Sequence, residues 1–287
     1  MNPNRRDFLK KSSMAGAGLA ILPSFLNATN FTSSATFGAT YMGDFAAPKL
    51  ETVRCAFIGV GARGSGHATR IANIEGTEIV SICDLYEDWA TNTANKCKEI
   101  GAGERHNEIS LYTGGENEWK KMLKKEKPDL VFISTPWKTH ASMAIYSMKK
   151  GAHAMVEVPI ALTIKEMWGI VDTSEKTKKH CMMLENVNYG REELLYLNMC
   201  RQGVLGELLH GEASYIHELK WQMNEVERGT GSWRTPHYAN RNGNLYPTHG
   251  LGPVAQYMNL ARGEDNFKRI VSMSSPGKGR NIYAKKN

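Results

Sequence analysis

The amino-acid sequence predicts an α/β fold built on a doubly wound parallel sheet, and three observations carry this prediction. Short apolar runs, beginning with "VRCAFIGV" at Val53, alternate with helix-like stretches. A glycine-rich turn follows the first run, and an aspartate ends the second. Strands of about 5 to 7 residues that alternate with helices indicate βαβ units. Continuous apolar strands are typical of parallel sheets that are covered on both faces.

The expected elements follow one another up to about residue 160. A strand from residue 53 leads through a glycine turn into a helix that reaches Asn73. The run "TEIVSICD" at 77–84 is the second strand, and a polar helix spans 86–100. A third strand is expected at 128–136 ("PDLVFISTP"), a helix at 140–150 and a fourth strand at 152–157 ("AHAMVE"). The 287 residues allow one or two domains.

The glycine turn has the pattern G-x-G-x-x-G, from Gly59 through Gly61 to Gly64. Gly59 permits the tight turn, Gly61 lets the backbone approach a pyrophosphate, and Gly64 allows close helix–strand packing. Asp84 lies 20 residues after Gly64, where an acid would bind the ribose hydroxyls of NAD. The pattern predicts a Rossmann domain that holds NAD rather than NADP, although Arg63 in the loop leaves that preference open. The alternative is an ordinary glycine turn followed by a loop aspartate.

The N-terminal segment has the features of an export signal. "NRRDFLK" at 4–10 contains paired arginines, and the apolar run at 14–26 is shorter than the about 20 residues that span a bilayer. We therefore expect a twin-arginine signal peptide and linker at 1–48, a Rossmann domain at 49–160 and a substrate domain at 161–287. The translocase would be a partner, and the protein would be exported, folded, to the periplasm. The alternative is a frayed helix with two chance arginines.

Charge and cysteines exclude other classes of protein. The net charge is +7, and much of it lies in the N-terminal segment and in lysines on predicted helices. No basic stripe is interleaved with aromatic residues as in single-strand binding proteins, so no nucleic-acid partner is expected. The five cysteines, at 55, 83, 97, 181 and 200, have no C-x-x-C spacing. We expect neither a metal site nor a disulfide framework.

Beyond the second βα unit the sequence resembles the Gfo/Idh/MocA oxidoreductases. Their usual Glu-Lys-Pro appears here as Glu157-Val158-Pro159, and valine cannot transfer a proton. This triplet is similar to that of the NAD-dependent glycoside hydrolases of family 109, typified by α-N-acetylgalactosaminidases. The resemblance continues through "TPWKTH" (135–140), "MMLENVNYGR" (182–191), "GELLHGEASYIHEL" (206–219), "WRTPHY" (233–238) and "NGNLYPTHGLGPVAQYMN" (242–259).

The resemblance implies a C-terminal α/β domain with an open, mostly antiparallel sheet, to which strands at 208–219 and 267–275 would belong. Because the family runs well beyond residue 287, we expect a C-terminally truncated chain with an incomplete sheet. Exposed sheets in the superfamily often mediate dimers, so a homodimer is a further expectation.

The resemblance also assigns site residues by position. Together with the glycine loop and Asp84, the NAD site would comprise Ala62, Arg63, Trp137, His140, Glu157, Val158 and Asn186. The sugar, a terminal N-acetylhexosamine of a small glycan, would be held by Tyr215, Arg234, Tyr246, Pro247, Thr248 and His249. Many relatives have an aromatic residue in place of Thr139.

The chemistry that the resemblance implies is a redox cycle inside a hydrolysis. NAD oxidises C3 of the sugar, a base removes the C2 proton, the aglycone leaves C1, water adds, and the ketone is reduced again. An imidazole titrates near neutral pH, so His249 is the first candidate acid–base, and Tyr189 is the candidate C2 base. An NAD that is recycled within each turnover needs no cellular pool, which explains export after folding.

Several alternatives stay open. His249 could cap a helix, Tyr189 and Tyr215 could be packed aromatics, and Arg234 could be a structural ion-pair partner. The whole protein could be an exported NAD(P)-dependent sugar oxidoreductase, or an inactive, sugar-binding relative. Net reduction of the cofactor during turnover would distinguish the oxidoreductase, and failure to release an aglycone would distinguish the binding protein.

Overall fold

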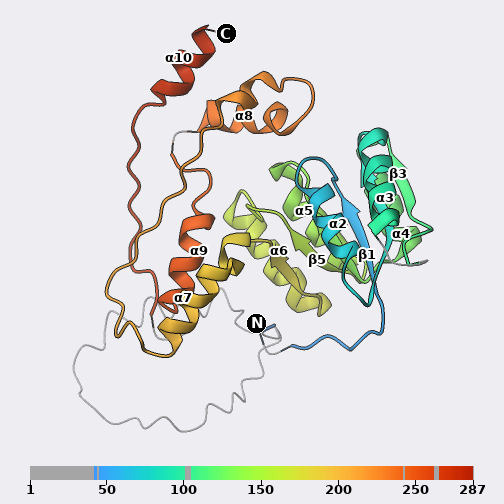
Figure 1. Cartoon of the computed structure of the whole chain (residues 1–287), viewed down its shortest axis with the longest axis horizontal. Coiled ribbons are helices and arrows are strands. Elements are labelled where there is room, and N and C mark those ends of the chain that lie inside the picture. Colours follow the sequence, from blue (N-terminus) through green and yellow to red (C-terminus); the bar gives the residue numbers. More distant parts are fainter. Residues whose placement is uncertain (1–41, 44, 101–104, 242, 262–264, 287) are drawn as a thin grey trace, which may run out of the picture.

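The computed structural model describes residues 42–43, 45–100, 105–241, 243–261 and 265–286. Its centre is a parallel sheet of six strands in the order β3-β2-β1-β4-β5-β6 (Figure 1). The strands are β1 (Val53–Ile58), β2 (Thr77–Asp84), β3 (Ser110–Thr113), β4 (Leu130–Ile133), β5 (His153–Val156) and β6 (Cys181–Met183). The expected α/β fold with a parallel sheet is confirmed. The paired arginines and the apolar run of the expected signal lie outside the described residues.

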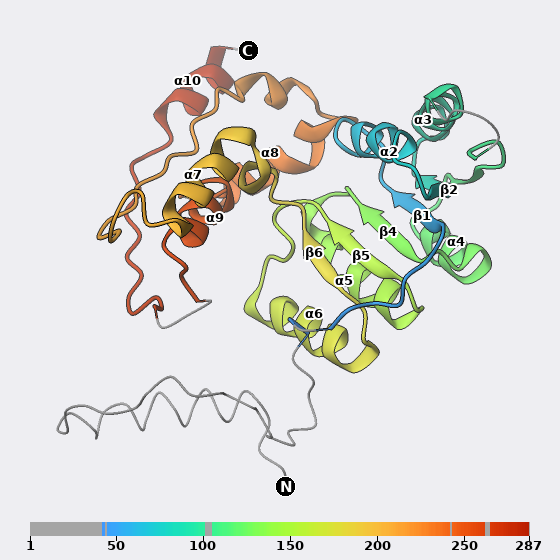
Figure 2. The same ribbon diagram turned by 60° about the horizontal axis from the view of Figure 1, so that its bottom comes forward.

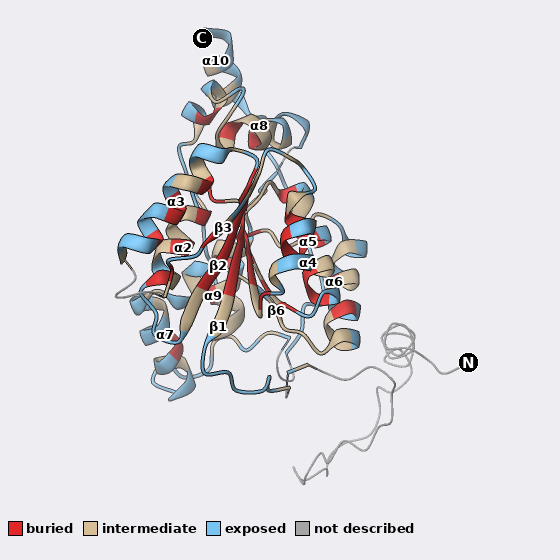
Figure 3. Cartoon of the chain, turned by 90° about the vertical axis from the view of Figure 1, so that its right-hand side faces the viewer, coloured by how far each residue is buried: buried red, intermediate tan, exposed pale blue. Residues whose placement is uncertain are grey.

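Five helices cover the two faces of the sheet, as the edge-on view in Figure 3 shows. On one face, α2 (Gly64–Ala72) and α3 (Glu87–Ile100) enclose a core with the strands. On the other face, α4 (Glu118–Glu126), α5 (Trp137–Lys149) and α6 (Ile164–Thr177) enclose a second core. Burial on both faces accounts for the continuous apolar runs of the central strands.

The sheet differs from the expectation at its two edges. Neither β3, which is only four residues long, nor β6, which is three, is among the strands expected from the sequence. Because β6 pairs with β5, the sheet continues beyond residue 160, where we had expected the Rossmann domain to end.

The strand order reverses around β1 and β4, and ligands of such sheets bind at the carboxyl ends of the strands near that reversal.

The chain after β6 forms helices, which lie together on one side of the sheet in Figure 2. They are η1 (Asn186–Tyr189), α7 (Arg191–Arg201), η2 (Lys220–Asn224), α8 (Thr230–Asn240), α9 (Thr248–Tyr257) and α10 (Lys278–Lys286). Here α9 packs against η1 and α7. Within the described ranges, no helix has both the length and the apolarity required to cross a bilayer.

The C-terminal sheet expected from the resemblance is not formed by the described residues, which contain no strand after Met183. Two residues of the segment 208–219, Gly211 and Ala213, nevertheless lie against α9. The side chain of Ile216 is 86% exposed, and that of Ile270 is 95% exposed. Both segments therefore lack the strand partners that would satisfy their backbone and cover their apolar side chains.

Candidate functional site

The glycine turn lies between β1 and α2 and is closely approached by neighbouring backbone. Gly59 has φ +83°, and a Cβ there would lie 2.7 Å from the Ser134 carbonyl oxygen. A Cβ on Gly64 would lie 1.9 Å from the Gly59 oxygen, so only glycine fits. At Arg63 the N-cap of α2 has no side-chain hydrogen bond. The turn therefore presents a helix N-terminus whose amides suit an anion such as a pyrophosphate.

Asp84 ends β2 beside this turn. Its carboxylate accepts hydrogen bonds from the backbone N–H of Val60 at 2.7 Å and of Tyr86 at 3.0 Å. Burial raises the pKa of Asp84 above its usual value, while these hydrogen bonds and the charge of Arg228 act in the opposite direction. The acid is thus fixed next to the glycine turn, as the dinucleotide pattern predicts.

A loop from the C-terminal part of the chain closes over the same region. Arg228, just before α8, donates to both carboxylate oxygens of Asp88, at 2.8 and 2.7 Å. Its guanidinium carbon lies 4.2 Å from the ring centre of Tyr86 and 4.0 Å from that of Trp89. Trp89 in turn faces Gly61, where an added Cβ would lie 2.9 Å from the indole. We name this arrangement of Arg228, Asp88, Tyr86 and Trp89 the Arg228 clamp; it was not predicted from the sequence.

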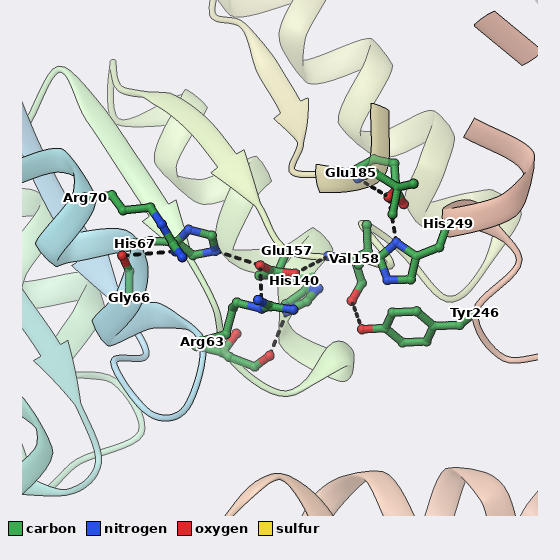
Figure 4. Close-up of polar contacts among 12 residues, drawn as sticks. Arg63, Gly66, His67, Arg70, His140, Glu157, Val158, Glu185, Tyr246 and His249 are labelled. Carbon is green, nitrogen blue, oxygen red and sulfur yellow. Dashed lines mark hydrogen bonds and ion pairs between the residues drawn. The ribbon is translucent and has the colours of Figure 1, made fainter. Parts of the chain in front are cut away.

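Glu157 follows β5, and Figure 4 shows it facing His67 and Arg63. Its Oε1 lies 2.7 Å from His67 Nε2 and 3.6 Å from Arg63 Nε, and its Oε2 accepts the Val158 N–H at 3.1 Å. Burial alone would raise the pKa of Glu157, but these contacts together hold it below its usual value. Glu157 is therefore a fixed negative charge at the carboxyl end of the sheet.

His140 has a supporting position. Its Nδ1 lies 2.8 Å from the Pro159 carbonyl oxygen, and its Nε2 lies 2.7 Å from that of Thr135. Burial lowers the pKa of His140 below its ordinary value, with the two carbonyl groups acting in the other direction. Because both ring nitrogens face backbone oxygens, this histidine ties together the loops after β4 and β5 and offers neither nitrogen to a ligand.

Aromatic rings gather beside these loops. Trp137, at the start of α5, lies 5.2 Å from Trp233 and 5.5 Å from Tyr246, measured between ring centroids. Tyr246 lies 5.1 Å from Tyr215 and 4.9 Å from His249, and Tyr215 and His249 are 5.2 Å apart. These five residues are called the aromatic cluster below. They come from four separate segments, and three of them were expected to hold the sugar.

Arg234 of α8 lies against the aromatic cluster. Its guanidinium carbon is 4.4 Å from the ring centre of Tyr246 and 5.2 Å from that of Trp137. The residue is 8% exposed, and its Nε and Nη2 are buried with no hydrogen-bond partner among the residues that the structure describes. Buried donors left unpaired are rare and unfavourable, so these two nitrogens mark a place for an acceptor from a ligand.

Tyr246 and Val158 connect the aromatic cluster to the sheet. The Tyr246 hydroxyl donates to the Val158 carbonyl oxygen at 2.9 Å. Burial raises the pKa of Tyr246 to about 12, against the lowering effect of Arg234. The side chain of Val158 is buried and carries no proton, so the position after Glu157 supplies structure and a backbone acceptor only.

His249 pairs with a residue that the sequence analysis did not single out. Its Nδ1 lies 2.6 Å from Oε1 of Glu185, the residue that precedes η1 (Figure 4). The carboxyl group of Glu185 is buried. An acid directly after the apolar residues 182–184 was the available signal, but its partner is 64 residues away in the sequence.

The remaining candidates lie at the margins. Pro247 and Thr248 form the start of α9, where they carry the backbone that orients His249. Asn186 is exposed at the start of η1. Tyr189, at the end of η1, is 57% exposed and makes none of the ring contacts that unite the aromatic cluster. Ala62 lies between Gly61 and Arg63 at the glycine turn.

Family models match two parts of the chain. Residues 53–185 match the oxidoreductase family with an NAD-binding Rossmann fold. Residues 189–287 match the C-terminal domain of glycosyl hydrolase 109. The first match ends at Glu185, two residues after β6, which agrees with the extent of the parallel sheet.

Curated relatives match almost the whole chain. A glycosyl hydrolase family 109 protein from Akkermansia muciniphila is 63% identical over 87% of this chain, which spans 51% of that protein. A protein of Shewanella oneidensis named alpha-N-acetylgalactosaminidase is 50% identical over 99% of this chain, which spans 61% of that protein. The chain therefore covers about half to three fifths of these relatives.

Solved structures show the same fold at low identity. The myo-inositol 2-dehydrogenase of Lactobacillus plantarum has a TM-score of 0.58 and 21% sequence identity. The match covers 72% of this chain and 57% of the chain of that enzyme. A scyllo-inositol dehydrogenase of Lactobacillus casei, solved with NAD(H) and scyllo-inositol, has a TM-score of 0.57 and 17% sequence identity. The match covers 72% of this chain and 56% of the chain of that enzyme. At this identity they support the fold alone.

Proposed function

Because the chain belongs to glycosyl hydrolase family 109, we propose that it is an NAD-dependent glycosidase that releases terminal α-linked N-acetylgalactosamine. The name of the Shewanella oneidensis relative supports this substrate. The observation that carries the proposal is the buried guanidinium of Arg234, with two unpaired nitrogens beside the rings of Trp137 and Tyr246. Aromatic faces together with a few placed polar donors are typical of small-ligand sites.

The residues at the carboxyl ends of β1 and β2 fit the dinucleotide. Gly59 and Gly64 leave no room for a Cβ, so the turn packs closely at the start of α2, whose amides suit a pyrophosphate, and Asp84 is held where it can accept from a ribose. Arg63, Trp137, Glu157 and Val158 would flank the rest of the cofactor. When bound, NAD supplies a reversible oxidation of the sugar at C3, taking up a hydride and returning it within the same turnover.

The chain itself must then bind, orient and move protons. Arg234 would donate to sugar hydroxyls or to the acetamide oxygen, and Tyr215 and Tyr246 would pack on the sugar ring. Nε2 of His249, the nitrogen away from Glu185, would take the hydroxyl proton at C3 as the ketone forms and return it afterwards. Removal of the C2 proton by Tyr189 stays a prediction.

Val158 favours the glycosidase over a sugar oxidoreductase. A dehydrogenase that uses a lysine after Glu157 would need a protonatable side chain there, whereas Val158 presents only its carbonyl oxygen, to Tyr246. The site thus keeps an acid–base group at His249 and lacks one at position 158.

We further propose export by the twin-arginine route to the periplasm, with NAD bound beforehand; this rests on the "NRRDFLK" sequence.

The test is turnover of a chromogenic α-N-acetylgalactosaminide in deuterated water with the NAD-loaded protein. We expect aglycone release, deuterium at C2 of the freed sugar and no accumulation of reduced nicotinamide. Release with hydrogen wholly retained at C2 would overturn the redox–elimination route. Accumulation of reduced nicotinamide without aglycone would show the sugar oxidoreductase instead, and binding without either would show an inactive relative.

A further inference from the structure

The pair formed by Glu185 and His249 joins two parts of the fold. Glu185 lies two residues after β6, at the edge of the parallel sheet, and His249 lies in the first turn of α9. Their contact of 2.6 Å is short for a nitrogen–oxygen hydrogen bond, as expected where one partner is charged. The side chain of Glu185 is 3% exposed and that of His249 is 13% exposed, so water does not compete strongly for the contact.

We propose that Glu185 is a positioning residue for His249, holding its ring with Nδ1–H toward the carboxylate and Nε2 toward the aromatic cluster. The proposal deepens the proposed function, on which it rests for the reaction. A carboxylate accepts hydrogen bonds and cannot donate them when ionised, so it selects the tautomer with the proton on Nδ1. The lone pair is then on Nε2, on the opposite side of the ring.

Glu185 is itself held in place. Its Oε1 also accepts the Val187 N–H at 3.1 Å, which caps η1, and its own N–H donates to the Met183 carbonyl at 3.0 Å. Its Cγ lies beside Gly252 of α9, where an added Cβ would be 3.1 Å away. The carboxylate is therefore fixed by the strand end, by η1 and by α9 before it meets the imidazole.

The charge of Glu185 is aimed at His249 with little else to neutralise it. Its second oxygen, Oε2, is buried and has no hydrogen-bond partner within the described part of the chain. The titratable rings that face His249 are the phenols of Tyr215 and Tyr246, and burial raises the pKa of Tyr246 to about 12. A buried carboxylate in this setting stabilises the imidazolium that forms when Nε2 accepts a proton. The same pair could be a purely structural ion pair between sheet and α9, so the test must separate the two roles.

The experiment starts with the unaltered protein. Nitrogen-15 NMR of the His249 ring reports which nitrogen carries the proton, and it does not depend on any activity. We expect the Nδ1–H tautomer with a strongly hydrogen-bonded proton. Finding the proton on Nε2 would overturn the proposal even if the protein proves to be a glycosidase, and finding it on Nδ1 would support the proposal even if glycosidase activity is absent.

The variant Glu185→Gln keeps the shape and removes the charge. Since general acid–base catalysis contributes roughly 10²- to 10⁴-fold, we expect kcat to fall within that range with KM little changed. The His249 tautomers should become mixed, and the acidic limb of the pH profile of kcat/KM should move to lower pH. Glu192→Gln, which alters an exposed acid in the first turn of α7, is the matched control and should change none of these.

Glu185→Asp completes the set, because it retains the charge but withdraws it by one methylene. We expect it to recover part of the lost kcat and to restore the Nδ1–H tautomer in part. A Glu185→Gln protein that folds, keeps the tautomer and keeps kcat, with only a lower melting temperature, would assign Glu185 a structural role and overturn the proposal. If Glu185→Gln does not fold, the tautomer of the unaltered protein decides.

Discussion

Arg228 and Asp88 form a two-pronged ion pair, with Arg228 Nη2 at 2.8 and 2.7 Å from the two carboxylate oxygens, across 140 residues of sequence. The pair fixes the loop before α8 over the end of β2, where Asp84 and Trp89 lie beside the glycine turn. The C-terminal part of the chain thus helps to enclose the region that fits the dinucleotide.

The first prediction concerns this enclosure. Arg228→Ala removes both the ion pair and the stacking on Tyr86 and Trp89, so bound NAD should dissociate about two- to tenfold faster. Stopped-flow measurement of NAD displacement checks the rate. The difference from the unaltered protein should shrink at high salt, because the ion pair is exposed. Arg201→Ala, on the exposed end of α7, is the control; equal rates for all three proteins would contradict the prediction.

The second prediction concerns the unpaired nitrogens of Arg234. Arg234→Met retains an unbranched apolar chain but removes a buried, incompletely paired charge. We expect the melting temperature to stay constant or rise, while KM for the glycoside increases about tenfold or more. Calorimetry and initial rates check the two effects separately. A large loss of stability with unchanged KM would mean that Arg234 has the structural role left open by the sequence.

The third prediction compares two glycines in α2. Gly64→Ala would place a Cβ 1.9 Å from the Gly59 oxygen, whereas Gly66→Ala meets only Arg70 Nη1, the end of a flexible side chain, at 3.3 Å. Gly64→Ala should therefore lower the free energy of unfolding by about 1–3 kcal/mol and weaken NAD binding. Gly66→Ala should be neutral or stabilising by up to about 1 kcal/mol, since alanine favours helix. Urea denaturation distinguishes them, and similar midpoints would contradict the close packing of the turn.

The fourth prediction concerns stability in acid. The contributions of Glu157 and Asp84 to the free energy of unfolding should change with pH in opposite directions. The pKa of Glu157 is lowered in the fold, so its contribution is present above its ordinary value of 4.5 and is lost as pH falls further. The pKa of Asp84 is raised, so its contribution is present below its ordinary value of 3.8 and is lost as pH rises through the folded value.

Melting temperatures of Glu157→Gln and Asp84→Asn between pH 3 and pH 7 (about the range set by these values) test this difference. The difference in melting temperature between the unaltered protein and Glu157→Gln should narrow as the solution is acidified. The melting temperature of the unaltered protein minus that of Asp84→Asn should increase as the solution is acidified. Parallel curves for the two variants would contradict the environments described for these carboxyl groups.

The sequence predicted best the features that are local in the chain. The glycine turn, Asp84 and the central strands depend on spacing and on burial from both faces, which leave a pattern within a few residues. β3 was missed because its four residues are only partly buried and so lack a continuous apolar run. Glu185 and Arg228 were missed because their roles depend on partners brought close only by folding. The strand expected at 208–219 is not formed by the described residues, because one segment's alternation does not reveal whether a neighbour pairs with it.

The contact between Glu185 and His249 also ties together parts of the chain that lie 64 residues apart. Glu185 follows the last strand of the parallel sheet, and His249 lies in the first turn of α9. The imidazole therefore keeps its carboxylate partner only while α9 stays in its place against η1.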